Sequence, residues 1–303
     1  MDGILNIFKE KGYTSHDVVA IVRRTINQKK VGHTGTLDPD AEGVLPICVG
    51  KATKLADYIM NSGKTYEAEV TLGAQTTTQD ASGEIISRTE FVFDENKITE
   101  AVLSFKGSYM QIPPMYSAIK INGKKLYELA RKGQEVERKP RKVDINEIKI
   151  IEFLPPDKIR ISVDCSKGTY IRALSSDIGE KLGCGAYMSS LTRTRSGKFN
   201  IQNSIKLSKL EELSKNGDLS QAIITMENAL ESYKRVYVNP KADKLMHNGA
   251  KIYSYYFDKK SDFINPGETV TAFDSTLNLN GIYRTEFDEE KRCILIKPIT
   301  ILL

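Results

Sequence analysis

The residue with the clearest chemical potential is Asp38, which lies in a glycine-rich and proline-rich segment. Residues 32–47 read GHTGTLDPDAEGVLPI. Pro39 fixes its own backbone and favours an extended conformation at Asp38, while Gly35 and Gly43 permit backbone shapes that other residues resist. The pattern predicts one carboxylate in a tightly specified loop. The alternative is an ordinary Asx-type turn, because Asp-Pro is a common turn pair.

Three further segments agree with this loop in order and spacing when the chain is set beside one known family. They read GKTY at 63–66, QIPPMYSAIK at 111–120 and CSKGTYIR at 165–172. Together with residues 32–47 they resemble the TruB family, the bacterial tRNA pseudouridine-55 synthases, and the similarity runs from Leu5 to about Gly197. The resemblance implies isomerisation of uridine 55 in the T-arm of tRNA, without guide RNA, metal, nucleotide or other cofactor.

The resemblance also assigns catalytic roles to Asp38, Arg172 and Tyr66. Breaking the bond to an anomeric carbon builds positive charge on the sugar, which the Asp38 carboxylate can stabilise or trap covalently. Whether Asp38 attacks the ribose or removes one of its protons stays open. Arg172 would keep the carboxylate ionised and aimed. Tyr66 would stack on the target base, although a strand residue of this type is otherwise typical of a core.

Five more positions match residues that bind the substrate in the family. They are His33, Tyr170, Leu191, Asp80 and Lys120. The target uridine lies inside a folded loop, so the enzyme should extrude it at a cost of roughly a few kcal/mol. His33 would fill the vacated stack, and Tyr170 and Leu191 would line the pocket. Without the resemblance, Tyr170 and Leu191 are typical core residues and Asp80 a typical turn residue.

A basic, irregular insertion at about 107–142 is the predicted RNA-gripping segment. Its cationic residues are Lys120, Lys124, Lys125, Arg131, Lys132, Arg138, Lys139, Arg141 and Lys142. Phosphate contacts from such residues give affinity that falls with salt. A solvated helical face is the alternative interpretation.

The elements that must position these residues mix strands and helices without strict alternation, which predicts an α+β fold. We expect strands at 4–8, 66–72, 83–93, 143–153 and 158–165, helices after 14–17 and at 53–61, 95–105 and 170–182, and an ordered loop at 30–46. A pseudouridine-synthase-type mixed sheet would occupy 1–232. The short β-like runs of 233–303 resemble a PUA-like RNA-binding domain.

Composition sets outer limits on the class of protein. The chain has 303 residues and a net charge of +5, which suits a polyanionic partner without demanding one. The four cysteines lie far apart and predict no zinc site. No signal peptide or long apolar run is apparent, so we expect a cytoplasmic monomer that neither spans nor binds a membrane.

One departure and two rival functions remain. The family usually shows Asp-Lys-Pro-x-Gly-x-Thr-Ser near the N-terminus, whereas residues 8–15 read FKEKGYTS and lack the proline. The rivals are a guide-RNA-dependent pseudouridine synthase of another RNA and a tRNA-folding protein with incidental catalysis. Activity on a bare tRNA transcript separates the first rival from the stand-alone enzyme.

Overall fold

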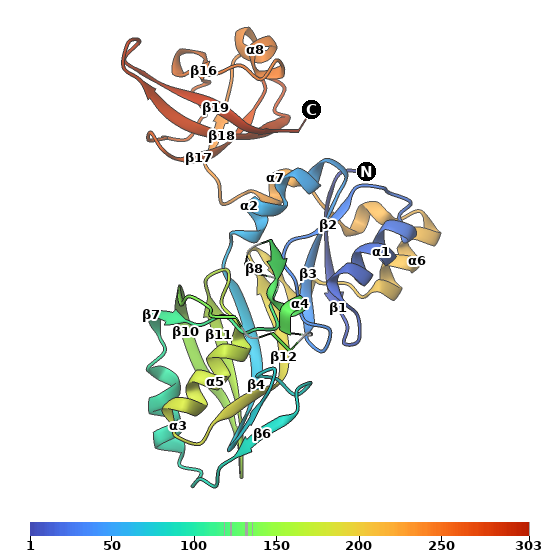
Figure 1. Cartoon of the computed structure of the whole chain (residues 1–303). Coiled ribbons are helices and arrows are strands. Elements are labelled where there is room, and N and C mark those ends of the chain that lie inside the picture. Colours follow the sequence, from blue (N-terminus) through green and yellow to red (C-terminus); the bar gives the residue numbers. More distant parts are fainter. Residues whose placement is uncertain (118, 122, 131–132, 135, 303) are drawn as a thin grey trace.

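Two β-sheets organise the chain. A computed structural model describes residues 1–117, 119–121, 123–130, 133–134 and 136–302. Within that part, the larger sheet has ten strands, and its main path runs β14-β1-β3-β12-β4-β11-β10-β7 (Figure 1). Its strands are β1 (Gly3–Lys9), β2 (Val31–His33), β3 (Glu42–Val49), β4 (Lys64–Leu72), β7 (Gly107–Gln111), β10 (Arg141–Leu154), β11 (Lys158–Cys165), β12 (Ala186–Ser196), β13 (Phe199–Asn200) and β14 (Ile223–Ile224). The predicted α+β class is confirmed.

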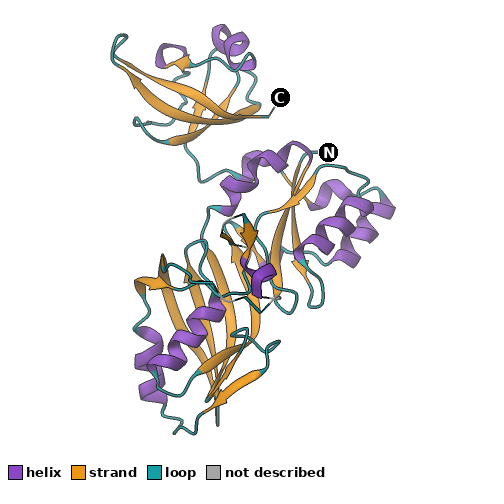
Figure 2. Cartoon of the chain, in the orientation of Figure 1, coloured by secondary structure: helices purple, strands orange, loops and turns teal. Residues whose placement is uncertain are grey.

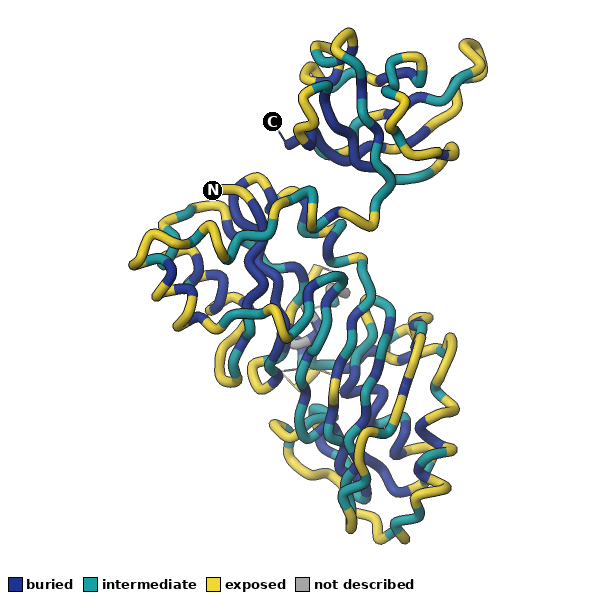
Figure 3. Tube along the Cα trace, turned by 180° about the vertical axis from the view of Figure 1, so that it is seen from behind, coloured by how far each residue is buried: buried dark blue, intermediate teal, exposed yellow. Residues whose placement is uncertain are grey.

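Helices cover the two halves of this sheet in separate groups, shown in purple in Figure 2. Helices α1 (Ser15–Thr25) and α6 (Leu207–Asn216) pack against β1 and β3 through Val18, Val22 and Leu210. Thr14 caps the N-terminus of α1 and forms a capping box with Asp17. Helices α3 (Glu95–Leu103) and α5 (Ile171–Lys181) pack on the half formed by β4, β10 and β11. In Figure 3 strand β3 is almost wholly buried, whereas β11 and β12 alternate between buried and intermediate residues.

The two halves meet where β3 runs parallel to β12, whereas the other strand pairs of this sheet are antiparallel within the described residues. Glu42 pairs with Thr192 and Gly43 with Arg193. Gly43 has φ +108°, and a Cβ there would lie 2.3 Å from the Arg193 carbonyl oxygen. Glycine is therefore required for the strands to approach this closely.

Three expectations for this domain need correction. The predicted loop 30–46 contains β2 and the start of β3, because Gly43 and Pro46 are accommodated within a strand. The predicted strand 83–93 is shorter: β6 (Ile85–Arg88) pairs with β5 (Ala74–Thr76) in a separate two-stranded sheet. Strand β12 was not predicted, although it lies in the middle of the large sheet.

A five-stranded sheet forms the C-terminal part, in the order β15-β17-β18-β19-β16. Its strands are β15 (Arg235–Tyr237), β16 (Ile252–Tyr253), β17 (Thr269–Phe273), β18 (Leu279–Asp288) and β19 (Cys293–Ile301), with α8 (Asp243–His247) beside them. Phe273 and Ile282 share a hydrophobic cluster with Leu55 and Ile59 of the first domain. Tyr58, in α2 (Ala56–Met60), lies 3.1 Å from the Thr300 hydroxyl. The predicted β-rich C-terminal domain is therefore present.

Candidate active site

Asp38 occupies a short turn between β2 and β3. The Ala41 amide donates to the Asp38 carbonyl at 3.1 Å, which closes the turn with Pro39 at its second position. Before the turn, Leu37 is buried in the main core, and its amide donates to the Ser15 hydroxyl at 2.9 Å. The turn is thus anchored through its backbone.

Lys9 lies beneath the same turn and was not recognised from the sequence as a site residue. Its ammonium donates to the carbonyls of Pro39 at 3.1 Å and Ala41 at 2.6 Å. The side chain is fully buried, and desolvation lowers its pKa to about 8. A lysine at the end of an apolar strand is the one sequence signal that could have drawn attention to it.

Arg172, in the first turn of α5, faces the Asp38 carboxylate. Its Nε lies 3.1 Å from Asp38 Oδ2, and Nη1 lies 3.3 Å from Asp80 Oδ2. Nη2 donates to the Tyr116 carbonyl at 2.7 Å. The Arg172 side chain is 6% exposed, whereas that of Asp38 is 40% exposed. The structure thus brings together a buried cation and a reachable carboxylate.

The electrostatics of Asp38 reflect two opposing influences. Desolvation by the surrounding protein raises the pKa of Asp38, and the Arg172 guanidinium lowers it by a smaller amount. Asp80 adds a further increase because it is a second carboxylate near the same arginine. The Arg172 guanidinium therefore favours the ionised form of Asp38, as its predicted role requires, although desolvation outweighs its effect on the pKa.

Tyr66 lies on β4 and is 8% exposed, within the same core cluster as Leu37 and Leu191. Desolvation raises the pKa of the Tyr66 phenol, and the neighbouring Arg193 guanidinium opposes that rise. Leu191 is likewise buried, at 7% exposed, on β12.

Arg193 is a second residue of the site that sequence reasoning missed. It is 1% exposed, and its Nε donates to the Val44 carbonyl at 2.7 Å. Its Nη2 donates to the Gly35 carbonyl at 3.2 Å, so one guanidinium holds both sides of the Asp38 turn. A buried arginine is costly unless its donors are bonded, and here the loop backbone supplies the acceptors.

Three further predicted binding residues have described side chains, namely His33, Tyr170 and Asp80. His33 ends β2, its Nδ1 accepts from the Gly35 amide at 3.2 Å, and desolvation lowers its pKa. Tyr170 immediately precedes α5, and desolvation raises the pKa of its phenol. Asp80 binds its own turn through Oδ1, which accepts from the Ser82 amide at 3.0 Å, while Oδ2 faces Arg172.

The predicted RNA-gripping insertion begins with β7 and is described in part. It contains β8 (Lys120–Ile121), β9 (Lys124–Lys125) and α4 (Leu126–Ala130). The Lys120 side chain lies outside the described residues, as do Arg131 and Lys132 and the side chains of Lys124 and Lys125.

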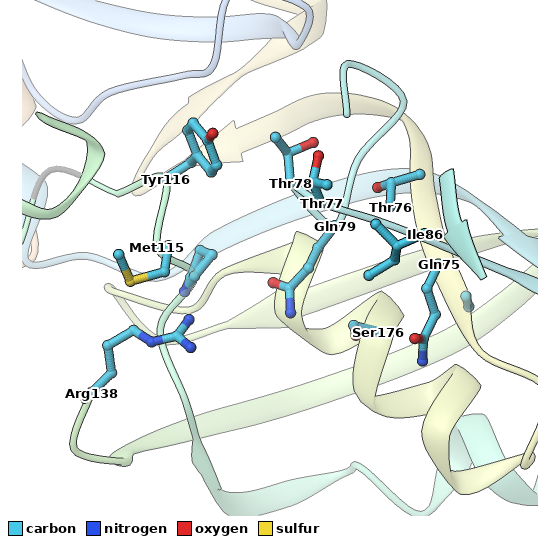
Figure 4. Close-up of a pocket in the computed structure, with 12 residues that line it drawn as sticks. Gln75, Thr76, Thr77, Thr78, Gln79, Ile86, Met115, Tyr116, Arg138 and Ser176 are labelled. Carbon is cyan, nitrogen blue, oxygen red and sulfur yellow. The ribbon is translucent and has the colours of Figure 1, made fainter. Parts of the chain in front are cut away.

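A cavity of about 230 Å³ adjoins the site (Figure 4). Thr78 and Tyr116, whose carbonyls both accept from Arg172, are among its lining residues. Gln79 and Ser176 line it as well, whereas Asp38 and the other residues predicted to carry chemistry do not. The cavity therefore lies beside the catalytic candidates without containing them.

None of the described helices is long and apolar enough to cross a bilayer. Solved structures with a similar fold include a Cbf5-Nop10-Gar1 complex, at 28% identity and TM-score 0.79, covering 99% of this chain and 85% of that one. An H/ACA RNP bound to a substrate RNA containing 2'-deoxyuridine matches at 26% identity and TM-score 0.77, with 99% and 85% of the two chains covered.

Sequence comparisons place the chain within one family. Residues 23–171 match the N-terminal domain of the TruB family pseudouridylate synthases, and residues 172–231 match the tRNA pseudouridylate synthase B C-terminal domain. The tRNA pseudouridine synthase B of Alkaliphilus oremlandii is 52% identical over 84% of each chain. That of Lachnoclostridium phytofermentans is 46% identical over the whole of both chains. The chain therefore belongs to the TruB family of tRNA pseudouridine synthases, which are isomerases.

Proposed function

We propose that this protein converts uridine 55 in the T-arm of tRNA to pseudouridine, with Asp38 as its catalytic carboxylate and no cofactor. The observation that carries the proposal is the 3.1 Å ion pair between Asp38 and Arg172, in which the carboxylate is 40% exposed and the arginine is buried. A carboxylate held this way can meet a substrate while its counter-charge stays fixed. Relatives at 46–52% identity named tRNA pseudouridine synthase B support the reaction class.

In this isomerisation the bond between ribose C1′ and uracil N1 breaks, the uracil turns, and C5 bonds to C1′. The C5 hydrogen leaves as a proton, and N1 acquires one. In the interval Asp38 either stabilises or traps the positive sugar carbon, or acts as a base that removes a ribose proton and later returns it. Because the uracil is both leaving group and returning nucleophile, no second carboxylate has to activate water. Arg172 orients the Asp38 carboxylate, and Tyr66 stacks on the uracil.

The protein acts as a monomer with two RNA-contacting regions outside the reaction centre. The catalytic domain spans 1–232, and its insertion at 107–142, including Lys120, grips the T-arm through phosphate contacts. The PUA-like domain at 233–303 also binds the tRNA. His33, Tyr170, Leu191 and Asp80 receive the extruded nucleotide and its neighbours.

Tritium release from a bare tRNA transcript carrying 5-tritiated uridine tests the reaction. Native protein should release tritium, Asp38→Asn should not, and mapping the product should locate it at position 55. Activity without guide RNA or partner proteins would exclude the guide-dependent rival. An Asp38→Asn variant that still refolded tRNA would reveal an additional folding role, whereas equal tritium release by both proteins would refute the proposed carboxylate.

A further inference from the structure

The side chain of Gln111 holds both backbone groups of a single residue, Tyr170. Gln111 ends β7 and is 1% exposed. Its Oε1 accepts from the Tyr170 amide at 2.8 Å, and its Nε2 donates to the Tyr170 carbonyl at 3.0 Å. A buried amide left without its hydrogen-bond partners destabilises the fold by the desolvation free energy of the amide. This two-point contact therefore fixes Tyr170 relative to the end of β7.

Tyr170 is the residue from which α5 begins. It is extended, with φ −99° and ψ 111°, and makes no side-chain cap for the helix. Arg172 follows two residues later, in the first helical turn. The position of Tyr170 thus sets where the helix starts, and with it where the guanidinium meets Asp38.

A second contact joins the same two segments. The chain after Gln111 continues to Tyr116, whose carbonyl accepts from Arg172 Nη2 at 2.7 Å. Hydrogen bonds therefore join residues 111–116 to residues 170–172 at two points, Gln111 to Tyr170 and Tyr116 to Arg172. Displacing Tyr170 would move Arg172 against this acceptor as well as against Asp38.

The orientation of the Gln111 amide follows from its other neighbour. Its Nε2 also donates to the Tyr109 hydroxyl at 2.5 Å, and Asp177 of α5 lies near that hydroxyl. The nitrogen side thus faces two acceptors, and the oxygen side faces a backbone N–H. A flipped amide would place like groups against each other, so the observed orientation is the one that satisfies every partner.

We propose that Gln111 is a positioning residue for the isomerisation. Its amide sets the start of α5 and so holds the Arg172 guanidinium against Asp38. This inference rests on the proposed function, because it assumes that the Asp38–Arg172 pair performs the chemistry. It assigns Gln111 no contact with substrate.

Two variants and a control test the role. Gln111→Met keeps the length and loses both bonds, whereas Gln111→Glu keeps one acceptor and sets a carboxylate oxygen against the Tyr170 carbonyl. Asn6→Leu is the control, since Asn6 is a buried amide on β1, 4% exposed, that donates to the Asn200 carbonyl at 2.9 Å. Each protein is assayed for folding by circular dichroism, for tRNA dissociation constant and for single-turnover pseudouridine formation.

We expect both Gln111 variants to lower the single-turnover rate constant on the order of 30-fold, because small displacements of reacting groups are costly. The tRNA dissociation constant should change by less than about threefold, since the phosphate contacts that provide most of the affinity are unaffected and only the Tyr170 contact is disturbed. Asn6→Leu should leave the rate constant unchanged. As pH falls from about 8 to about 5.5, Gln111→Glu should recover relative to native protein, because a protonated carboxyl donates and accepts like an amide. Tyr109 stays protonated over this range because burial raises its pKa, whereas Asp177, whose pKa is raised to about 6, titrates in native protein as well, so its own effect appears in the native pH profile.

A native rate constant in a folded Gln111 variant would overturn the proposal. So would a loss in Gln111→Glu that is equal at every pH and matched by weaker tRNA binding, which is what a purely structural role predicts. If native protein formed no pseudouridine at all, the proposed function itself would fail, and the native arm of the assay reveals that case directly.

Discussion

Two turns in this molecule each begin with an aspartate and are closed by the same kind of backbone hydrogen bond. They differ in the partners of the aspartate carboxylate. In the catalytic domain the Ala41 amide donates to the Asp38 carbonyl at 3.1 Å, and in the C-terminal domain the Leu277 amide donates to the Asp274 carbonyl at 3.0 Å. The Asp274 carboxylate is hydrogen-bonded within its own turn, because its Oδ1 accepts from the amides of Thr276 at 2.9 Å and Asn278 at 3.0 Å.

The Asp38 carboxylate, among the described residues, accepts nothing from its own turn and faces Arg172. Its turn is held instead by side chains from elsewhere, namely Lys9 and Arg193. The pKa values diverge accordingly. Desolvation raises both, but hydrogen bonds from Thr276 and Asn278 carry the pKa of Asp274 below its ordinary value, whereas that of Asp38 stays raised. Because Lys9 and Arg193 hold the turn, the Asp38 carboxylate remains free to interact with a substrate.

The largest expected difference between the two turns is in catalysis. Asp38→Asn should lower pseudouridine formation by at least about 10³-fold, because the amide cannot stabilise or trap the sugar cation. Its unfolding free energy should change by less than about 1 kcal/mol, since the side chain does not brace the turn. Single-turnover assays and urea denaturation measure the two effects. A large loss of stability would mean that Asp38 is structural in the way Asp274 is.

Removing the brace beneath the Asp38 turn should change how stability depends on pH. The pKa of Lys9 is lowered from 10.5 to about 8, so between these values the folded protein has lost a proton that the unfolded chain still binds. Native stability should therefore rise with pH through this window, by up to about 3 kcal/mol from Lys9. Lys9→Met should lack that part of the rise in urea denaturation at both ends of the window. If the unfolding free energies of both proteins changed equally with pH, the lowered pKa of Lys9 would be contradicted.

Arg193→Lys probes the brace that spans both sides of the turn. A lysine cannot reach the Gly35 and Val44 carbonyls together, because it lacks the planar fork of the guanidinium. The single-turnover rate constant should fall about 30-fold with little change in tRNA affinity. Arg195→Lys, on the same strand but bonded to Asp164, is the matched control and should retain activity. Equal losses in both would show that the effect belongs to the strand and not to the turn.

The smallest expected effect lies in the C-terminal turn. Asp274→Asn keeps an acceptor for its turn but loses the charge that strengthens those hydrogen bonds, so unfolding free energy should fall by about 1 kcal/mol. Pseudouridine formation by the folded variant should match that of native protein. A loss of activity at unchanged tRNA affinity would break the contrast between the two turns.

The candidate site could be predicted because four segments of the chain resemble one family, and the remainder depends on distant partners. Local pattern alone indicates an ordinary Asp-Pro turn at Asp38 and assigns Arg172 no role. Strand β12 escaped prediction because bulges near Ser190 and Arg195 interrupt its alternation, and its serines, threonines and arginines resemble a surface segment. Lys9 and Arg193 escaped because a buried cation is tolerated only where carbonyls from another part of the chain converge, which no local pattern encodes.

Gly43 gives the junction between the sheet halves a further meaning. Even a methyl group at this position would collide with the main chain of Arg193, at 2.3 Å from its carbonyl oxygen. The segment that bears Asp38 and the strand that bears Arg193 are therefore in direct main-chain contact. A shift of one segment would displace the other. The placement of the Asp38 segment against Arg193 thus depends on the absence of a side chain at position 43.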